Sequence, residues 1–184
     1  MYGQVHYVCR TVATVSELGW MAVTVTHDVL VHTMQPASPR VVIVRVNDIY
    51  GRSVGGGEET LAHQLGMSVV DVIEYDSHVY DPQVIATRIA LDRADVVWDV
   101  SYLDDGVAIW QALLRVGVKL KAAIGTSSAF CMLAFSQRLG PGSIGVSAAD
   151  KPDEPISPAA PAAPGQARRD QPRSPPATAP GGRA

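Results

Sequence analysis

Cysteine, histidine and aromatic residues are scarce in this chain of 184 residues, and neither sign of charge is in large excess. The two cysteines, Cys9 and Cys131, are too few for a disulfide framework or a four-thiolate metal site. The five histidines form no H-x-x-x-H or H-E-x-x-H pair, so the sequence predicts no metal centre. The 15 Lys and Arg against 18 Asp and Glu argue against nucleic-acid binding, because that needs clustered positive charge.

Long apolar runs are also missing. No stretch of about 18 apolar residues occurs, so the sequence predicts no membrane-spanning helix. The first residues, MYGQVHYVCR, lack the basic start and apolar middle of a secretory signal peptide. As written, the chain is therefore expected to remain in the cytoplasm.

Proline is concentrated near the C-terminus. Nine of the 13 prolines lie in residues 152–180, and Ile156 is the only large apolar residue after Val146. Such a segment cannot bury enough surface to offset the entropy lost on ordering it, so we predict one folded domain at 1–147 and a disordered Pro/Ala-rich tail at 148–184. The same composition also fits a linker, a proline-rich ligand of a small recognition domain, or G+C-rich DNA translated out of frame.

Hydrophobic patterning divides residues 1–147 into alternating helices and strands. The β-branched run RVVIVRV is typical of a buried strand, Gly66 marks a helix end, and Asp81-Pro82 is a typical helix start. The predicted helices lie at 15–34, 52–65, 81–93, 103–116 and 128–139, and the predicted strands at 40–46, 68–74, 96–98, 122–125 and 143–147.

Strands that alternate with single helices run parallel, and their right-handed crossovers place helices on both faces of the sheet. The sequence therefore predicts an α/β fold, a doubly wound and mostly parallel five-stranded sheet of the Rossmann or flavodoxin-like kind. Ligands of such sheets bind at the carboxyl ends of the strands. The loops of interest are those at 47–52, 76–81, 99–104 and 125–128.

The glycine-rich segment 51–57 does not match a phosphate-binding loop. Glu58 and Glu59 follow it where a nucleoside-triphosphate loop has a lysine, and both would repel phosphate. The dinucleotide-binding spacing G-x-G-x-x-G is also absent. The sequence therefore predicts no cofactor.

Candidate nucleophiles and acid–base pairs are equally weak. Ser127 and its neighbour Ser128 are not part of a G-x-S-x-G elbow. Cys131 is interpreted as a core residue, and the adjacent Asp104 and Asp105 as caps of the following helix. We therefore predict that the chain is not an enzyme.

Hydroxyl and aromatic side chains remain at the strand ends. Hydroxyls and helix-start amides that converge on a cleft suit the reversible binding of a small polar solute. The residues alone equally allow that the tyrosines are packing residues and the serines are helix caps. The candidate ligand-binding residues are Tyr50, Ser101, Tyr102, Thr126 and Ser127.

Several segments, taken in order, carry a family resemblance. They are VVIVRVNDIYGRS at 41–53, SVVDVIEY at 68–75, ADVVWDVSYLDDGVAIWQALLRVGVK at 94–119, IGTSS at 124–128 and LGPGSIGVS at 139–147. Together they resemble the type I periplasmic solute-binding proteins of ABC importers, in the leucine-binding-protein-like branch that takes up branched-chain amino acids and amides. Upstream, Cys9-Arg10-Thr11 is similar to the stretch where the chain of these proteins enters its second lobe.

The resemblance implies a protein with two α/β lobes that close on a ligand, of which this chain would provide the second lobe only. By position, Tyr50 and Tyr102 match two tyrosines that contact the ligand in the family. Ser127 departs from the pattern, because some amino-acid binders have an acidic residue there for the ammonium group. The implied function is the substrate-binding component of an ABC transporter for amino acids, amides or related small polar solutes, in truncated form. The implied partners are the solute and the membrane permease, and the family is periplasmic.

Two other functions remain open from the sequence. A cytoplasmic ligand-sensing domain of the same fold agrees with the missing signal peptide. A flavodoxin-like, nucleotide-binding enzyme domain shares the strand and helix order.

Overall fold

The computed structural model describes residues 15–30, 32, 38–126 and 129–150. Within these residues, five strands form one sheet in the order β2-β1-β3-β4-β5, and each neighbouring pair is parallel. The strands are β1 Arg40–Val46, β2 Ser68–Tyr75, β3 Val96–Val100, β4 Ala122–Thr126 and β5 Val146–Ala149. The predicted α/β fold with a parallel five-stranded sheet is confirmed. The predicted tail lies outside the described residues from residue 151 onwards.

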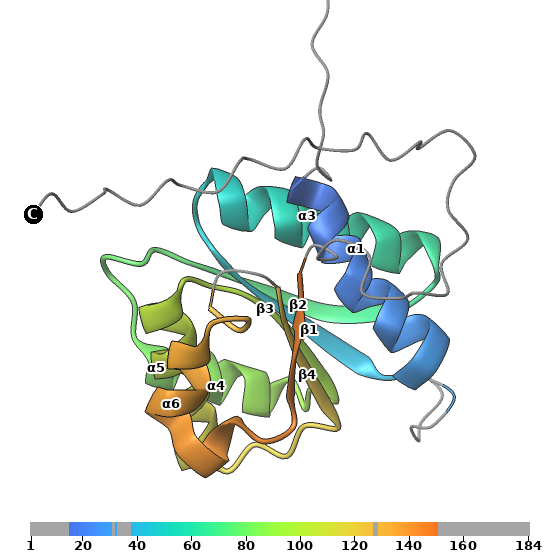
Figure 1. Cartoon of the computed structure of the whole chain (residues 1–184). Helices are drawn as coiled ribbons and strands as arrows, with labels where there is room; N and C mark the ends of the chain where they lie inside the picture. Colours follow the sequence, from blue (N-terminus) through green and yellow to red (C-terminus); the bar gives the residue numbers. More distant parts are fainter. Residues whose placement is uncertain (1–14, 31, 33–37, 127–128, 151–184) are drawn as a thin grey trace, which may run out of the picture. The chain divides into compact units, whose positions relative to one another are not determined.

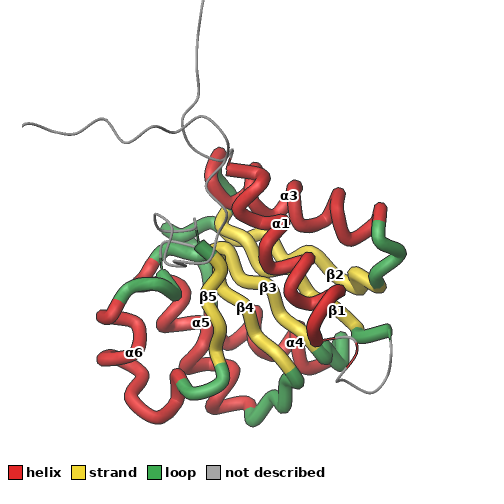
Figure 2. Tube along the Cα trace, turned by 45° about the vertical axis from the view of Figure 1, so that its right-hand side comes forward, coloured by secondary structure: helices red, strands yellow, loops and turns green. Residues whose placement is uncertain are grey.

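Helices cover both faces of this sheet (Figure 1). On one face lie α1 (Val15–Val25), its π-helical continuation η1 (Thr26–Leu30) and α3 (Ile49–Gln64). On the other lie α4 (Pro82–Leu91), α5 (Leu103–Val116) and α6 (Leu133–Leu139). Figure 2 shows the two helical layers with the sheet between them. No helix in the described part of the chain has the length and apolar character needed to cross a membrane.

The central strand β3 is the most deeply buried element of the sheet. All five of its residues are buried, and Trp98 has no exposed surface. The indole N–H of Trp98 donates to the Thr26 hydroxyl (3.0 Å), which in turn donates to the Ala22 carbonyl (2.8 Å). The polar end of a buried indole needs such a partner, so this pair connects the α1 layer to the middle of the sheet.

Most element boundaries differ from the sequence-based prediction by one or more residues, and three of the differences have a clear local description. Helix α3 begins at Ile49 instead of residue 52, because the Asp48 carboxylate accepts from the Gly51 N–H (2.7 Å) and caps the helix there. Helix α6 begins only at Leu133, after Met132, which makes no side-chain cap bond. A short 3-10 helix, η2 (Gly140–Ser143), displaces the last strand, so that β5 runs two residues past the predicted domain limit at 147.

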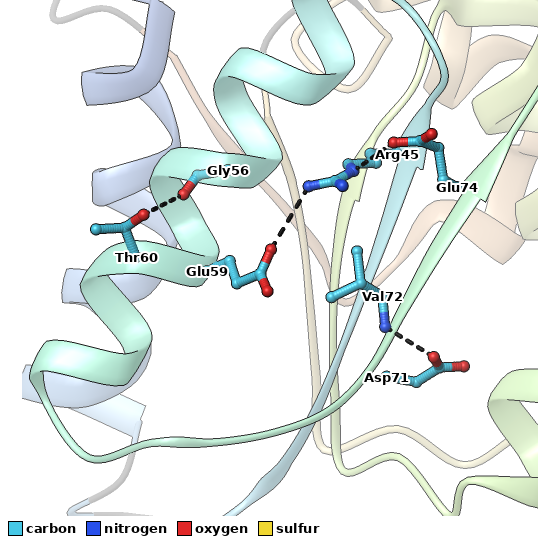
Figure 3. A network of polar contacts seen from close by, with 7 residues as sticks. All are labelled: Arg45, Gly56, Glu59, Thr60, Asp71, Val72 and Glu74. Atoms are coloured by element: carbon cyan, nitrogen blue, oxygen red, sulfur yellow. Dashed lines mark hydrogen bonds and ion pairs between the residues drawn. The ribbon is translucent and has the colours of Figure 1, made fainter.

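Arg45 of β1 connects helix α3 to the neighbouring strand β2. Its Nε donates to Glu74 Oε2 (3.0 Å) on β2, and its guanidinium lies 3.7 Å from Glu59 Oε2 on α3 (Figure 3). Its aliphatic stem passes under Gly55, where an added Cβ would lie 2.7 Å from the Arg45 Cδ. Because Gly55 has no side chain, α3 can approach the Arg45 side chain closely.

Helices α1 and α3 approach each other closely because glycines face the contact. A Cβ added at Gly57 of α3 would lie 2.4 Å from the Ser16 carbonyl oxygen, and one at Gly19 of α1 would lie 2.5 Å from the Val54 carbonyl oxygen. Both distances are far inside van der Waals contact, and both obstacles are backbone atoms that cannot rotate away. By contrast, nothing lies within 4 Å of a Cβ at the adjacent Gly56.

This difference predicts opposite effects for two neighbouring alanine substitutions. Gly57→Ala should lower the free energy of unfolding by about 1–3 kcal/mol, because it forces the two helices apart. Gly56→Ala should raise it by about 0.5–1 kcal/mol, because alanine restricts the unfolded chain and favours a helix. Urea denaturation followed by circular dichroism measures both. Equal effects of the two substitutions would contradict the packing described.

Candidate functional site

Two tyrosines meet at the edge of the sheet where the parallel strands have their carboxyl ends. Tyr50 lies in the first turn of α3, after β1, and Tyr102 occupies the N-cap position of α5, after β3. Their rings are stacked, with centroids 5.5 Å apart and planes 30° from parallel. Because β1 and β3 are neighbours in the sheet, the two side chains that the sequence assigned to separate loops are in contact.

Asp48 holds this pair together. One carboxylate oxygen accepts from the Gly51 N–H (2.7 Å), and the other accepts from the Tyr102 hydroxyl (2.8 Å). The hydrogen bond to this carboxylate and partial burial raise the pKa of Tyr102 to about 12, because a phenolate would be repelled there. The Tyr102 hydroxyl therefore stays protonated and remains a donor at physiological pH.

The tyrosines border an open hollow of about 440 Å³. Its surface is largely apolar and accessible, with Ile49 84% exposed and Tyr102 43% exposed. Exposed apolar surface is found at many binding sites, which makes this hollow the candidate for a ligand. The carboxylate of Asp48 is the charged group in its lining, which consists of Val15, Asp48, Ile49, Tyr50, Ser53 and Tyr102.

Two other sequence-predicted site residues point into the protein. Ser101 and Thr126 are fully buried, so neither hydroxyl lines the hollow. Thr126 donates to Glu58 Oε1 (3.0 Å), and its backbone carbonyl accepts from the Tyr50 hydroxyl (2.8 Å). Ser101 donates to Asp99 and accepts from the Tyr75 hydroxyl (2.9 Å). Ser127, the remaining candidate, lies outside the described residues.

Both of these buried hydroxyls bond to carboxyl groups that the sequence analysis did not identify as part of the site. Glu58 has no exposed surface and Asp99 is 4% exposed. Burial raises the pKa of Glu58 to about 8 and that of Asp99 to about 7. Each has one oxygen without a hydrogen-bond partner among the residues that the structure describes. The one signal for Asp99 in the sequence is an acid inside the otherwise apolar strand VVWDV.

The interpretation of Asp104 and Asp105 as helix caps is wrong. Tyr102 is the N-cap residue of α5, and Asp105, 8% exposed, accepts hydrogen bonds from the hydroxyls of Tyr75 (3.3 Å) and Tyr80 (3.0 Å). Asp104 instead forms an ion pair with Arg138. Two tyrosines from the β2 side therefore outcompete the helix amides for the Asp105 carboxylate.

Cys131 is exposed, so its interpretation as a core residue is also wrong. It precedes the late start of α6, in the turn that the sequence analysis assigned to a helix. Partial burial and the nearby Asp150 raise the pKa of the Cys131 thiol to about 11. The group is therefore a thiol at neutral pH and not an activated nucleophile.

The lining of the hollow offers aromatic surface and one carboxylate. Over residues 15–30, 32, 38–126 and 129–150, no group of three or more His, Cys, Asp or Glu side chains is arranged to hold a metal ion.

No family model matches the chain. The chain is 31% identical over 116 residues to the Leu/Ile/Val-binding protein homolog 8 of Brucella abortus, an alignment that covers 62% of this chain and 29% of that protein. This relative is named as a binding protein and not as an enzyme, as the sequence predicts.

Solved structures with similar folds come from the same group of transport proteins. A branched-chain amino acid ABC transporter protein from Silicibacter pomeroyi aligns with a TM-score of 0.66 and 15% identity, over 74% of this chain and 34% of that one. A fatty acid ABC transporter substrate-binding protein from Thermomonospora curvata aligns with a TM-score of 0.62 and 19% identity, over 76% and 35%. This chain thus spans between 29% and 35% of the length of these proteins. The resemblance to the type I solute-binding proteins of ABC importers is therefore confirmed, in sequence by the Leu/Ile/Val-binding homologue and in fold by the solved structures.

Proposed function

We propose that this chain forms one wall of the binding site, the second lobe, of a solute-binding protein that delivers apolar amino acids to an ABC importer. The observation that carries the proposal is the stacked pair Tyr50–Tyr102, joined to the Asp48 carboxylate and facing an open hollow. The names of the similar proteins support a small solute as ligand and an ABC transporter as the system served. The resemblance to the type I solute-binding proteins adds a membrane permease as partner and a periplasmic place of work to the proposal.

The chemistry of the hollow favours an amino acid with an apolar side chain. Asp48 offers a negative charge to an ammonium group, and a carboxylate has room for further donors beside the two it already accepts. Ile49 and the Tyr102 ring offer apolar surface to the side chain. An acid without an ammonium group would be repelled by Asp48. We infer that Asp48 supplies on this wall the negative charge that Ser127 does not.

A single wall can bind such a solute only weakly. Closure between two lobes removes most of a ligand from water, whereas every group on one open wall stays hydrated. A neutral hydrogen bond that competes with water contributes about 1 kcal/mol, so three of them give about 3 kcal/mol and a dissociation constant in the millimolar range.

Weak binding by a single wall leads to a prediction about the affinity of the chain for leucine. The full 184-residue chain should bind leucine with a dissociation constant of about 1 mM or weaker, measured by chemical-shift changes in an NMR titration. The shifts should be confined to the Tyr50 and Tyr102 rings and the amides around Asp48. A micromolar constant would contradict the one-wall proposal. Micromolar binding of FMN, NAD or ATP would favour the flavodoxin-like alternative.

The second prediction concerns the charge of Asp48. Leucine should bind more tightly than 4-methylpentanoate, which has the same apolar chain but no ammonium group. In Asp48→Asn the two affinities should become equal, because asparagine caps α3 as well as aspartate but carries no charge. Binding is read from the same NMR titration.

A matched pair of tyrosine variants separates the site from the fold. Tyr102→Ala should remove the leucine-induced shifts, since it deletes half of the stacked pair. Tyr80→Phe serves as the control, because Tyr80 bonds to Asp105 away from the hollow. Loss of leucine binding in the control, or its persistence in Tyr102→Ala, would rule out the stacked pair as the binding surface.

A further inference from the structure

One buried threonine fixes the end of β4 to two points of helix α3. The Thr126 carbonyl accepts from the Tyr50 hydroxyl (2.8 Å), and the Thr126 hydroxyl donates to Glu58 (3.0 Å). Tyr50 and Glu58 are eight residues apart on α3, which is about two helical turns and places them on one face. The position of Tyr50 is thus linked to that of Glu58 through the backbone carbonyl and the hydroxyl of one residue, Thr126, which has no exposed surface.

Glu58 sits in a closed environment between α1, α3 and the sheet. On the α1 side, a Cβ added at Gly19 would lie 2.8 Å from the Glu58 Cγ, so the two groups are in close contact. On the sheet side, Thr126 of β4 is its hydrogen-bond partner. Its second carboxyl oxygen is buried and has no hydrogen-bond partner in the described part of the chain.

Two charged groups of the sheet act on Glu58, and neither neutralises it. Asp99 of β3 is itself an acid and opposes a second negative charge. Arg45 of β1 attracts it, but this guanidinium is already engaged by Glu74 and Glu59 (Figure 3). Burial is the largest effect, and with Asp99 it raises the pKa of Glu58 to about 8 in spite of the Thr126 hydrogen bond and Arg45.

We propose that Glu58 is a positioning residue of the tyrosine pair, which as a neutral acid holds Thr126 and Tyr50 in place and as a carboxylate releases them. The link from Glu58 to solute binding rests on the proposed function, in which the tyrosine pair is the solute-binding wall. The physical reason is that a buried carboxylate with an unbonded oxygen is costly, and water entry or a shift of α3 relieves that cost. Either change disturbs the Thr126 contacts.

The sign of the pH effect follows from the raised pKa. Below about pH 8 Glu58 is neutral and the contacts of Thr126 are intact, and above it Glu58 ionises and the contacts weaken. The Tyr102 hydroxyl does not ionise in this range, because its pKa is about 12. A change in the ring signals of the tyrosine pair between pH 6 and 9.5 therefore reports the titration of a group other than the Tyr102 hydroxyl.

The test follows the ring signals of Tyr50 and Tyr102 by NMR in the full chain with ¹³C-labelled tyrosine, without any solute. The wild-type signals should shift with a midpoint near pH 8, and Glu58→Gln should show no such transition, because the amide oxygen still accepts from Thr126 but cannot ionise. A transition that persists in Glu58→Gln, or is absent from the wild type, would overturn the proposal.

Three further variants identify the group that titrates. Glu59→Gln is the matched control, since the neighbouring acid pairs with Arg45 at the surface. The transition should persist in this variant, with any change confined to a lower midpoint as Arg45 is released toward Glu58. Asp99→Asn should shift the midpoint downwards by removing a repulsive charge, and abolition of the transition by this variant would assign it to Asp99 instead. Thr126→Val should uncouple the Tyr50 signal from pH, which tests the connection independently of the Glu58 variant.

Leucine titrations of the same proteins connect the inference to binding. The wild-type dissociation constant should rise about fivefold between pH 7 and 9, the equivalent of one neutral hydrogen bond, and stay constant in Glu58→Gln. If leucine binds at no pH while the ring signals titrate as expected, the proposed function fails and the coupling of Glu58 to the tyrosines stands. If leucine binds with the same affinity at both pH values in the wild type, Glu58 has no influence on the site.

Discussion

The Asp48 carboxylate joins the starts of two helices that follow different strands. It caps α3 through the Gly51 amide and accepts the Tyr102 hydroxyl at the start of α5. Parallel strands with right-handed crossovers bring these two helix starts to the same edge of the sheet, but topology alone does not fix their distance or orientation. One small acid in the turn after β1 does so, and the stacking of the two tyrosines depends on it.

A second layer of polar groups supports this edge from inside. The Ser101 hydroxyl donates to Asp99, and the Thr126 hydroxyl donates to Glu58. Both acids are buried, and burial favours their neutral form by raising their pKa values. A protonated carboxyl group fills this role at the expense of leaving one oxygen unbonded in each case. The edge of the sheet that carries the tyrosine pair is therefore supported by Glu58 and Asp99, whose protonation depends on pH. Strongly raised pKa values of this kind are more typical of functional sites than of purely structural layers.

The parts of the fold that depend on local pattern could be predicted from the sequence. The strand Arg40–Val46 and the helix Leu103–Val116 have the predicted limits, because β-branched runs and a C-terminal glycine mark them clearly. The parallel sheet predicted that Tyr50 and Tyr102 lie at the same edge, because both follow strand ends, but their contact depends on the strand order, which the sequence analysis did not predict. The burial of Glu58 could not be predicted, because it depends on the contact of α1 with α3, and an acid after a glycine run looks like an exposed residue. The last strand, predicted at 143–147, begins only at Val146, because the Gly-Pro-Gly segment before it forms a short helix of its own.

The glycines of α3 have a consequence for how the recognition surface comes into being. Gly51, Gly55, Gly56 and Gly57 all lie within this one helix, and each weakens it by about 0.5–1 kcal/mol relative to alanine. A segment of this composition has little tendency to be helical alone, and most of its stability must come from its neighbours. Folding of α3 is therefore cooperative with the docking of α1 and the sheet. We therefore expect local opening of α1 to weaken the segment that presents Tyr50, because the close contact of α1 with the glycines of α3 would be lost.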